Sequence, residues 1–152
     1  MTGIGADMMN VTSYRVIYGD TDQMGVVYYA NYLRWFERGR SELLRQLGLP
    51  YKSIEEQGFH FPVTEVSCRY LSSARYDDLI LIQTQLTAIK RASLHFSYTI
   101  IKDIDGSRLA VGSTKHACIG ADGRIARVPG ALAQHFAGVS LTLQSQKPPG
   151  PV

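Results

Sequence analysis

The sequence predicts an α+β domain in which an antiparallel five-stranded sheet wraps around one long helix. A single strand-like segment near the N-terminus precedes one long helical pattern. The chain after Gly58 then divides into four segments rich in Val, Ile, Thr and Tyr, joined largely by short turns. A helix and a sheet that share one core must pack as two layers.

The first strand is expected at residues 12–18, where β-branched and aromatic residues dominate. In the helix that follows, apolar residues recur at spacings of three and four, with charged residues between them. These apolar positions are Tyr28, Tyr32, Trp35, Phe36, Gly39, Leu43, Leu44 and Leu47. Gly48 and Pro50 are expected to end this helix. One further helical turn is expected with Ser53 as its N-cap and Glu56 as the capping-box partner.

The remaining strands are expected at residues 62–70, 79–89, 93–103 and 108–119. The third of these shows the clearest alternation, which predicts one face in the core and one face outside it. Leu94, Phe96, Tyr98 and Ile100 fall on one face, and His95, Ser97 and Thr99 on the other. Asp105-Gly106 predicts a tight turn between the last two strands. Residues 90–92 are expected to turn the preceding pair.

The length of 152 residues suits one domain. We expect a flexible N-terminal tail at residues 1–10, the folded domain at 11–140 and a flexible Pro/Gly-rich tail at 141–152. No run of about 18 apolar residues is present, and the first ten residues do not resemble a signal peptide. Membrane insertion is therefore not expected, and a cytoplasmic location follows by default.

The net charge of +3 is too small and too dispersed to favour nucleic acid, but it is compatible with an anionic small ligand. Cys68 and Cys118 form no CxxC pair and have no neighbouring histidine cluster, so no metal site is expected. We expect both to be buried thiols in a reduced compartment.

The chemistry is expected directly before the long helix, where Asp20 and Asp22 precede Gly25. The start of a helix presents unpaired amide N–H groups and the positive end of the helix dipole. Such amides can bind a carbonyl oxygen as it becomes an oxyanion, while a nearby carboxylate attacks the carbon or activates water. The alternative is that both aspartates only shape a turn and cap the helix.

The run Asp20-Thr-Asp-Gln-Met-Gly-Val-Val-Tyr-Tyr-Ala-Asn-Tyr32, continued by Leu33-Arg-Trp-Phe-Glu37, resembles the 4-hydroxybenzoyl-CoA thioesterase family of the hotdog fold. This family includes the short-chain acyl-CoA thioesterases associated with the Tol-Pal system, and the resemblance extends over residues 13–119. It implies hydrolysis of a short-chain or aromatic acyl-CoA thioester to free acid and CoA. No metal or redox cofactor is implied, because CoA is part of the substrate.

By this resemblance, Asp22 is the catalytic carboxylate, acting as nucleophile or as general base. The oxyanion donor is the backbone N–H of Tyr29, and Gly25 lets the loop pass close to the thioester. The Tol-Pal branch often has histidine where this chain has Tyr29, which leaves the subfamily and its acyl group open. Asp20 is interpreted as ordering the loop, with Asn31 as a polar anchor at the helix start and Tyr32 as a core ring.

The resemblance also places Lys90, Arg91 and Ser93 where the family binds the CoA nucleotide. Cations and a hydroxyl at a turn can contact phosphate oxygens. The alternative is an ordinary solvated hairpin. Some hotdog thioesterases use a carboxylate within the helix, and Glu37 is the candidate for that role here. A surface ion pair with Arg34 or Arg38 is the simpler interpretation of Glu37.

A homo-oligomer, either a dimer or a tetramer, is expected because hotdog domains pair their sheet edges and the family's active site lies at the dimer interface. Two other functional classes remain open, since a fold does not fix a function. One is a non-catalytic module that binds acyl-CoA or acyl-carrier protein. The other is a structural oligomer without a ligand.

Overall fold

A computed structural model describes residues 9–130 and 132–134. The expected C-terminal tail and residues 1–8 lie outside this range. Residues 9 and 10 were expected in the N-terminal tail but belong to the first strand, β1 (Met9–Arg15). The strand begins early because Met9 and Asn10 pair with Gln85 and Thr84 of a long neighbouring strand.

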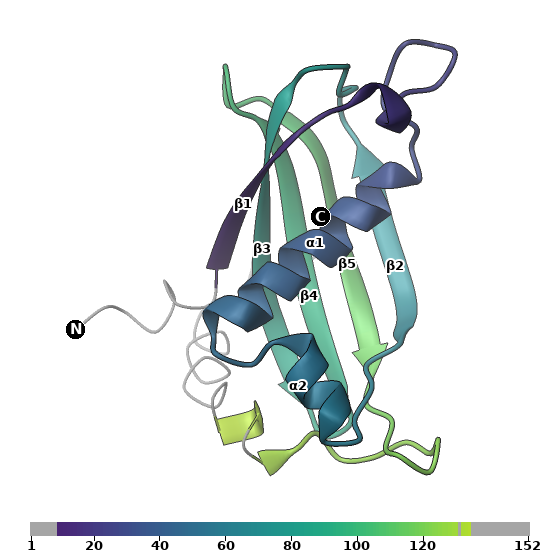
Figure 1. Cartoon of the computed structure of the whole chain (residues 1–152), viewed down its shortest axis with the longest axis vertical. Helices are drawn as coiled ribbons and strands as arrows, with labels where there is room; N and C mark the ends of the chain where they lie inside the picture. Colours follow the sequence, from purple (N-terminus) through teal and green to yellow (C-terminus); the bar gives the residue numbers. More distant parts are fainter. Residues whose placement is uncertain (1–8, 131, 135–152) are drawn as a thin grey trace, which may run out of the picture.

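The described chain follows the predicted order of one strand, a long helix and four further strands (Figure 1). After β1 come η1 (Tyr18–Asp20), α1 (Asn31–Gln46), α2 (Tyr51–Glu56), β2 (Val63–Tyr70), β3 (Leu79–Lys90), β4 (Ser93–Lys102) and β5 (Arg108–Ala117). The strands form one antiparallel sheet in the order β1-β3-β4-β5-β2. The edges of this sheet are therefore β1 and β2.

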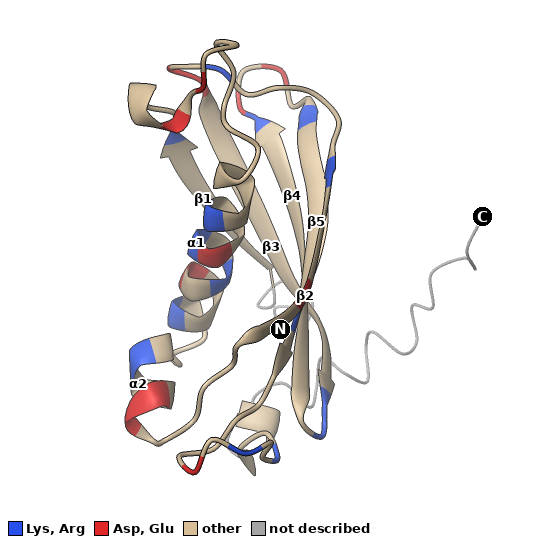
Figure 2. Ribbon diagram, turned by 90° about the vertical axis from the view of Figure 1, so that its right-hand side faces the viewer, with Lys and Arg blue, Asp and Glu red and all other residues tan. Residues whose placement is uncertain are grey.

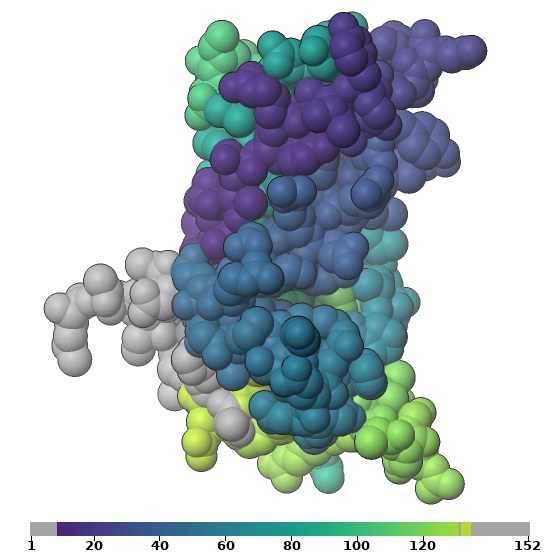
Figure 3. All heavy atoms as spheres, viewed as in Figure 1, coloured from purple at the N-terminus to yellow at the C-terminus, as the bar shows by residue number. Residues whose placement is uncertain are grey.

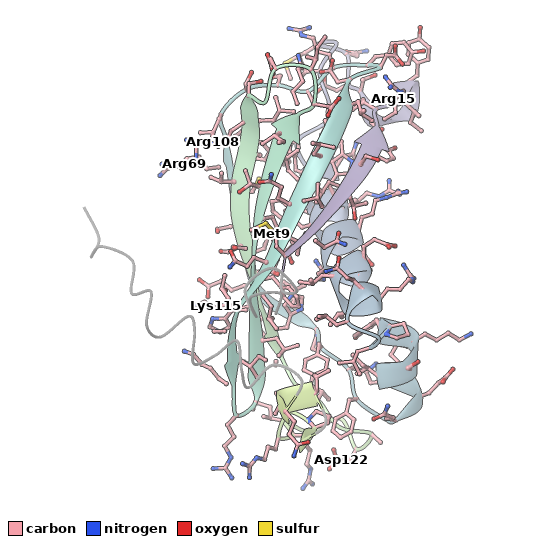
Figure 4. All side chains as sticks on the ribbon, turned by 90° about the vertical axis from the view of Figure 1, so that its left-hand side faces the viewer. Met9, Arg15, Arg69, Arg108, Lys115 and Asp122 are labelled. Carbon is pink, nitrogen blue, oxygen red and sulfur yellow. The ribbon has the colours of Figure 1, made fainter. Side chains whose placement is uncertain are left out.

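Both helices lie on one side of the sheet, so the molecule has the two expected layers (Figure 2). The predicted alternation along β4 is confirmed, because Leu94, Phe96, Tyr98 and Ile100 are all buried. The opposite face of the sheet points away from α1. Figure 4 shows Arg69 and Arg108 projecting from that face.

Glycines let α1 approach the sheet closely. A Cβ placed on Gly39 would lie 2.0 Å from Oγ1 of Thr84 and 2.8 Å from Cγ2 of Ile82. On β5, a Cβ placed on Gly112 would lie 2.5 Å from the ring of Phe36. Contacts this short are incompatible with a side chain, so these two positions set the distance between the layers.

The two helix starts differ from the sequence prediction. The helical pattern begins at Tyr28, but α1 begins at Asn31, and the N–H groups of Val27 and Tyr28 instead donate to the carbonyls of Ala74 and Asp20. The predicted cap at Ser53 is wrong. The carbonyl of Pro50 already accepts the N–H of Ser53, so α2 starts two residues before Ser53 and has no side-chain cap.

Two other expectations concern the cysteines and membranes. Cys118 is buried as expected, but Cys68 on the edge strand β2 is only half-buried. No helix within residues 9–130 and 132–134 is long and apolar enough to cross a membrane.

Candidate active site

The predicted motif lies in the segment from the last residue of η1 to the start of α1 (residues 20–30), which we call the catalytic loop after the role predicted for it. This loop projects from the upper right of the molecule in Figure 3. Its base is an isolated bridge between Thr21 and Val27. The loop is therefore a closed turn presented at the start of α1.

Asp20 anchors the catalytic loop from inside. Its carboxylate is buried and accepts hydrogen bonds from the Tyr14 hydroxyl at 2.8 Å and from the N–H of Ile17 at 3.0 Å. Its carbonyl accepts the N–H of Tyr28 and Nδ2 of Asn31, each at 2.9 Å. Burial and the hydrogen bond to Asp20 raise the pKa of Tyr14, so this hydroxyl stays protonated. These contacts agree with the structural roles expected for Asp20 and Asn31.

Asp22 is held at the outer side of the same loop. Its Oδ1 accepts the N–H of Met24 at 2.9 Å, and its own N–H donates to the carbonyl of Val26 at 2.9 Å. The side chain is half-buried and forms no ion pair with any described residue. One amide thus orients the carboxylate and leaves Oδ2 for other contacts.

Gly25 turns the loop back toward the helix. Its φ of +78° lies in the left-handed region, and its N–H donates to the carbonyl of Asp22 at 3.0 Å. No atom lies within 4 Å of a Cβ built at this position. Glycine is therefore favoured here by backbone conformation, while the space around it stays open.

Two amides at the entrance to α1 remain available. No described residue accepts the N–H of Tyr29 or Ala30, whereas the N–H of Asn31 donates to the carbonyl of Tyr28 at 2.9 Å. Unpaired N–H groups at a helix start attract negative charge. Asp22, Gly25 and Tyr29 thus all lie in the segment that leads from η1 into α1.

The connection between β2 and β3 supports the catalytic loop. The sequence did not predict this contact. Ala74 is fully buried, and its carbonyl accepts the N–H of Val27 at 2.8 Å. Its N–H donates to the hydroxyl of Tyr32 at 3.1 Å. Tyr70, at the end of β2, donates its hydroxyl to the carbonyl of Tyr29 at 2.8 Å. The pairing of β2 with β5 brings these residues together, and no local sequence pattern indicates it.

The expected nucleotide-binding residues lie at the other end of the sheet. β3 begins beside the catalytic loop, whereas Lys90 and Ser93 close its far end in a hairpin. A strand of 12 residues spans roughly 36 Å. A single chain therefore does not bring Lys90, Arg91 and Ser93 to Asp22.

Two further arginines join this basic end of the sheet. The N–H of Val128 donates to the carbonyl of Arg91 at 2.8 Å, which fixes the segment carrying Arg124 and Arg127 beside the hairpin. Lys90, Arg91, Arg124 and Arg127 are all exposed and form the basic cluster. Figure 2 shows Lys and Arg gathered at this lower end. Their separation in the sequence concealed the cluster.

An apolar groove runs between α1 and the edge strand β2. Its volume is about 300 Å³, and its apolar lining residues are Leu33, Phe36, Val63 and Val66, beside Arg34, Glu37, Arg40 and Thr114. β2 pairs only with β5 among the described strands, so its outer edge is open. Val63 and Val66 are 45% and 44% exposed, which is unusual for valines that face a core layer.

Glu37 lies on α1, more than one turn beyond the free amides, and also borders this groove. The expected ion pair with Arg34 or Arg38 is not among those formed by the described residues. Instead, Arg38 lies 4.9 Å from the ring centroid of Tyr14. Within the described residues, no group of three His, Cys, Asp or Glu is arranged to hold a metal ion.

The chain is similar to known thioesterases in sequence. The model of the thioesterase-like superfamily matches residues 16–136. The acyl-CoA thioesterase YbgC of Haemophilus influenzae is 37% identical over 106 residues, covering 69% of this chain and 76% of that protein. A 1,4-dihydroxy-2-naphthoyl-CoA hydrolase of Thermosynechococcus vestitus is 31% identical over 117 residues, covering 73% and 80%.

Solved structures share the same architecture. A hypothetical protein, TT1821, from Thermus thermophilus has a TM-score of 0.80 at 34% identity, over 86% of this chain and 96% of that one. The DHNA-CoA thioesterase of Staphylococcus aureus has a TM-score of 0.83 at 27% identity, over 93% and 97%.

Proposed function

This chain belongs to the thioesterase-like superfamily and is an acyl-CoA thioester hydrolase with the hotdog fold, and on that premise we propose that Asp22 is its catalytic carboxylate. The observation that carries the proposal is the turn in which an oriented carboxylate shares one loop with two free amides. The substrate carbonyl oxygen lies at the N–H of Tyr29, which stabilises the oxyanion that forms. Gly25 leaves room for the thioester beside Asp22.

Two chemical routes start from ionised Asp22. In the first, an Asp22 oxygen attacks the thioester carbon and expels the CoA thiolate, and water then hydrolyses the mixed anhydride. In the second, Asp22 takes a proton from the water that attacks. Both consume one water and release free acid and CoA-SH. A single turnover in ¹⁸O-water, followed by mass spectrometry, tests for the first route: ¹⁸O enters Asp22 when water attacks the aspartyl carbon of the anhydride, and the second route leaves Asp22 unlabelled.

The central test is hydrolysis by wild type and Asp22→Asn over acetyl-, butyryl-, hexanoyl-, lauroyl-, benzoyl- and 4-hydroxybenzoyl-CoA. We expect turnover of a short-chain or aromatic thioester and a loss of at least about 100-fold in Asp22→Asn. Asp105→Asn is the matched control, since Asp105 also accepts an N–H two residues ahead, from Ser107 at 2.9 Å, in a remote turn. Full activity in Asp22→Asn would refute the assignment and favour Glu37.

A non-catalytic module that binds acyl-CoA makes a different prediction in the same assay. It would bind these thioesters by calorimetry and hydrolyse none of them. The oriented Asp22 favours the enzyme, because binding alone does not require a carboxylate beside the thioester.

We expect a second copy of the chain to pack on the open edge of β2. The groove beside this edge exposes valines, and it carries Glu37 and Arg40 one helical turn apart. Two antiparallel α1 helices related by a two-fold axis can pair each Glu37 with the partner's Arg40. This arrangement also brings the basic cluster of one copy toward the catalytic loop of the other, where it can bind CoA phosphates.

Light scattering tests this assembly. We expect a dimer or tetramer in solution, and monomers with little activity for Val66→Glu, which places a charge in the groove. Arg69→Glu is the control, because Arg69 projects from the opposite face of the same strand (Figure 4). A monodisperse wild-type monomer at micromolar concentration would contradict the shared site.

A further inference from the structure

We propose that Tyr70 is a positioning residue that completes the oxyanion site by orienting the N–H of Ala30 through the carbonyl of Tyr29. This inference rests on the proposed function and extends it to a residue on a different element, 41 positions along the chain. The amides concerned are those of Tyr29 and Ala30, which no described residue accepts.

Each free amide belongs to a peptide unit whose carbonyl is already held. The N–H of Tyr29 shares its peptide plane with the carbonyl of Tyr28, which accepts the N–H of Asn31 at 2.9 Å. The N–H of Ala30 shares its plane with the carbonyl of Tyr29. That carbonyl accepts a long 3.3 Å bond from the N–H of Tyr32 and the 2.8 Å bond from Tyr70. Tyr70 thus supplies the shorter of the two restraints on the second plane.

The hydroxyl is well placed to act as a permanent donor. The ring of Tyr70 packs edge-on to Tyr32 at 5.0 Å and to Tyr29 at 6.4 Å, so its direction is fixed by the residues around the helix start. Tyr70 is 44% exposed, but its partial burial and the neighbouring Cys68 thiol raise its pKa, so the hydroxyl keeps its proton throughout the neutral range.

A hydrogen bond to a carbonyl also polarises its peptide unit. The electron density moves toward the oxygen, and the N–H on the other side of the unit becomes a better donor. Tyr70 therefore orients the Ala30 N–H and strengthens it. Ala30 thus joins Tyr29 as a second oxyanion donor, and Tyr70 acts on the reaction through the Ala30 N–H.

Tyr70→Phe removes the hydroxyl and keeps the ring. Tyr51→Phe is the matched control, because the Tyr51 hydroxyl also makes one bond to a backbone group, the N–H of Phe61 at 3.0 Å, near α2. We expect kcat to fall roughly 10-fold in Tyr70→Phe, with KM within twofold of wild type, and to stay unchanged in Tyr51→Phe. Light scattering and melting curves establish that both variants assemble and fold.

A spectroscopic measurement separates positioning from a general structural effect. The probe is a CoA derivative in which a methylene replaces the thioester sulfur and the carbonyl carries ¹³C, so it binds without being hydrolysed. Its infrared carbonyl band should move to lower frequency on wild type and on Tyr51→Phe. On Tyr70→Phe the band should return at least halfway to its position in free probe.

The outcomes are distinct from those of the Asp22 test, because the probe reports on the amides whether or not Asp22 is catalytic. A wild-type kcat in Tyr70→Phe overturns the inference. A lowered kcat with an unmoved carbonyl band also overturns it, since Tyr70 would then act by another route. Full activity in Asp22→Asn together with the expected Tyr70→Phe response would refute the carboxylate assignment and leave this inference supported.

Discussion

The two ends of the sheet use their polar groups in different ways. At the catalytic loop, Asp20, Asn31 and Ala74 bind the backbone of neighbouring segments, and Asp22 is already oriented by an amide. At the hairpin end, the four cations of the basic cluster are exposed, and none enters an ion pair among the described residues. Under the proposed function, the end that carries Asp22 is ordered before substrate binds, whereas the basic cluster pairs its charges only with the ligand.

The largest expected effect is acid destabilisation of the half of the sheet near the hairpin. His116 is buried and bonds the Phe61 carbonyl and the Thr114 hydroxyl at 2.9 and 2.8 Å. Burial, with a smaller effect from Arg40, lowers the pKa of His116 from 6.5 to about 4. The His116 ring is therefore protonated below about pH 6.5 in the unfolded chain, but only below about pH 4 in the folded chain. About 3 kcal/mol of stability should be present above pH 6.5 and lost by pH 4.

Urea unfolding between pH 7 and 4 measures this loss. His116→Gln should flatten the pH dependence, while the exposed His60→Gln should keep it. Amide exchange should show residues near Phe61 opening in acid before the amides of the catalytic loop. An unchanged slope in His116→Gln would show that carboxylates dominate the acid response.

A smaller effect is expected at two glycines with the same backbone conformation. Gly25 in the catalytic loop has φ +78°, and Gly106 in the turn between β4 and β5 has φ +71°, with open space around both. Alanine at either position should cost about 1–2 kcal/mol of stability because of the left-handed backbone. Only Gly25→Ala should also lower kcat, since it displaces Asp22. Thermal melts and steady-state rates distinguish the two, and equal kcat values would place Gly25 outside the site.

The smallest effects are expected in the basic cluster. Alanine at Lys90, Arg91 or Arg127 should each raise KM by roughly fivefold, about 1 kcal/mol, because exposed charge pairs are weak. The increase should shrink at 0.5 M salt and leave kcat unchanged. Arg108→Ala, on the opposite face of the sheet, is the control (Figure 4). Unchanged KM values in all three variants would show that the basic cluster does not bind the substrate and is an ordinary solvated surface.

The elements were predictable where local pattern and tertiary packing agree. The alternation from Leu94 to Ile100 marked β4, and the motif from Asp20 to Tyr32 marked the catalytic loop. The start of α1 was not predictable, because the segment before it is held by contacts with distant residues, such as the bond from the Val27 N–H to the Ala74 carbonyl, 47 positions along the chain. Tyr70 was not predictable for the same reason, because the pairing of β2 with β5 brings it to the carbonyl of Tyr29. The basic cluster forms because the segment with Arg124 and Arg127 folds back beside the β3–β4 hairpin. The charges in the sequence do not indicate this contact.

At Gly39 the backbone of α1 lies directly against the side chains of Thr84 and Ile82. The close approach at the middle of the helix therefore requires glycine at position 39. The space at the two ends of the helix depends on local side chains such as Leu33 and Leu44. We therefore expect relatives of this chain to differ in acyl preference through residues at the two ends of α1. The close contact at the midpoint of the helix should stay the same.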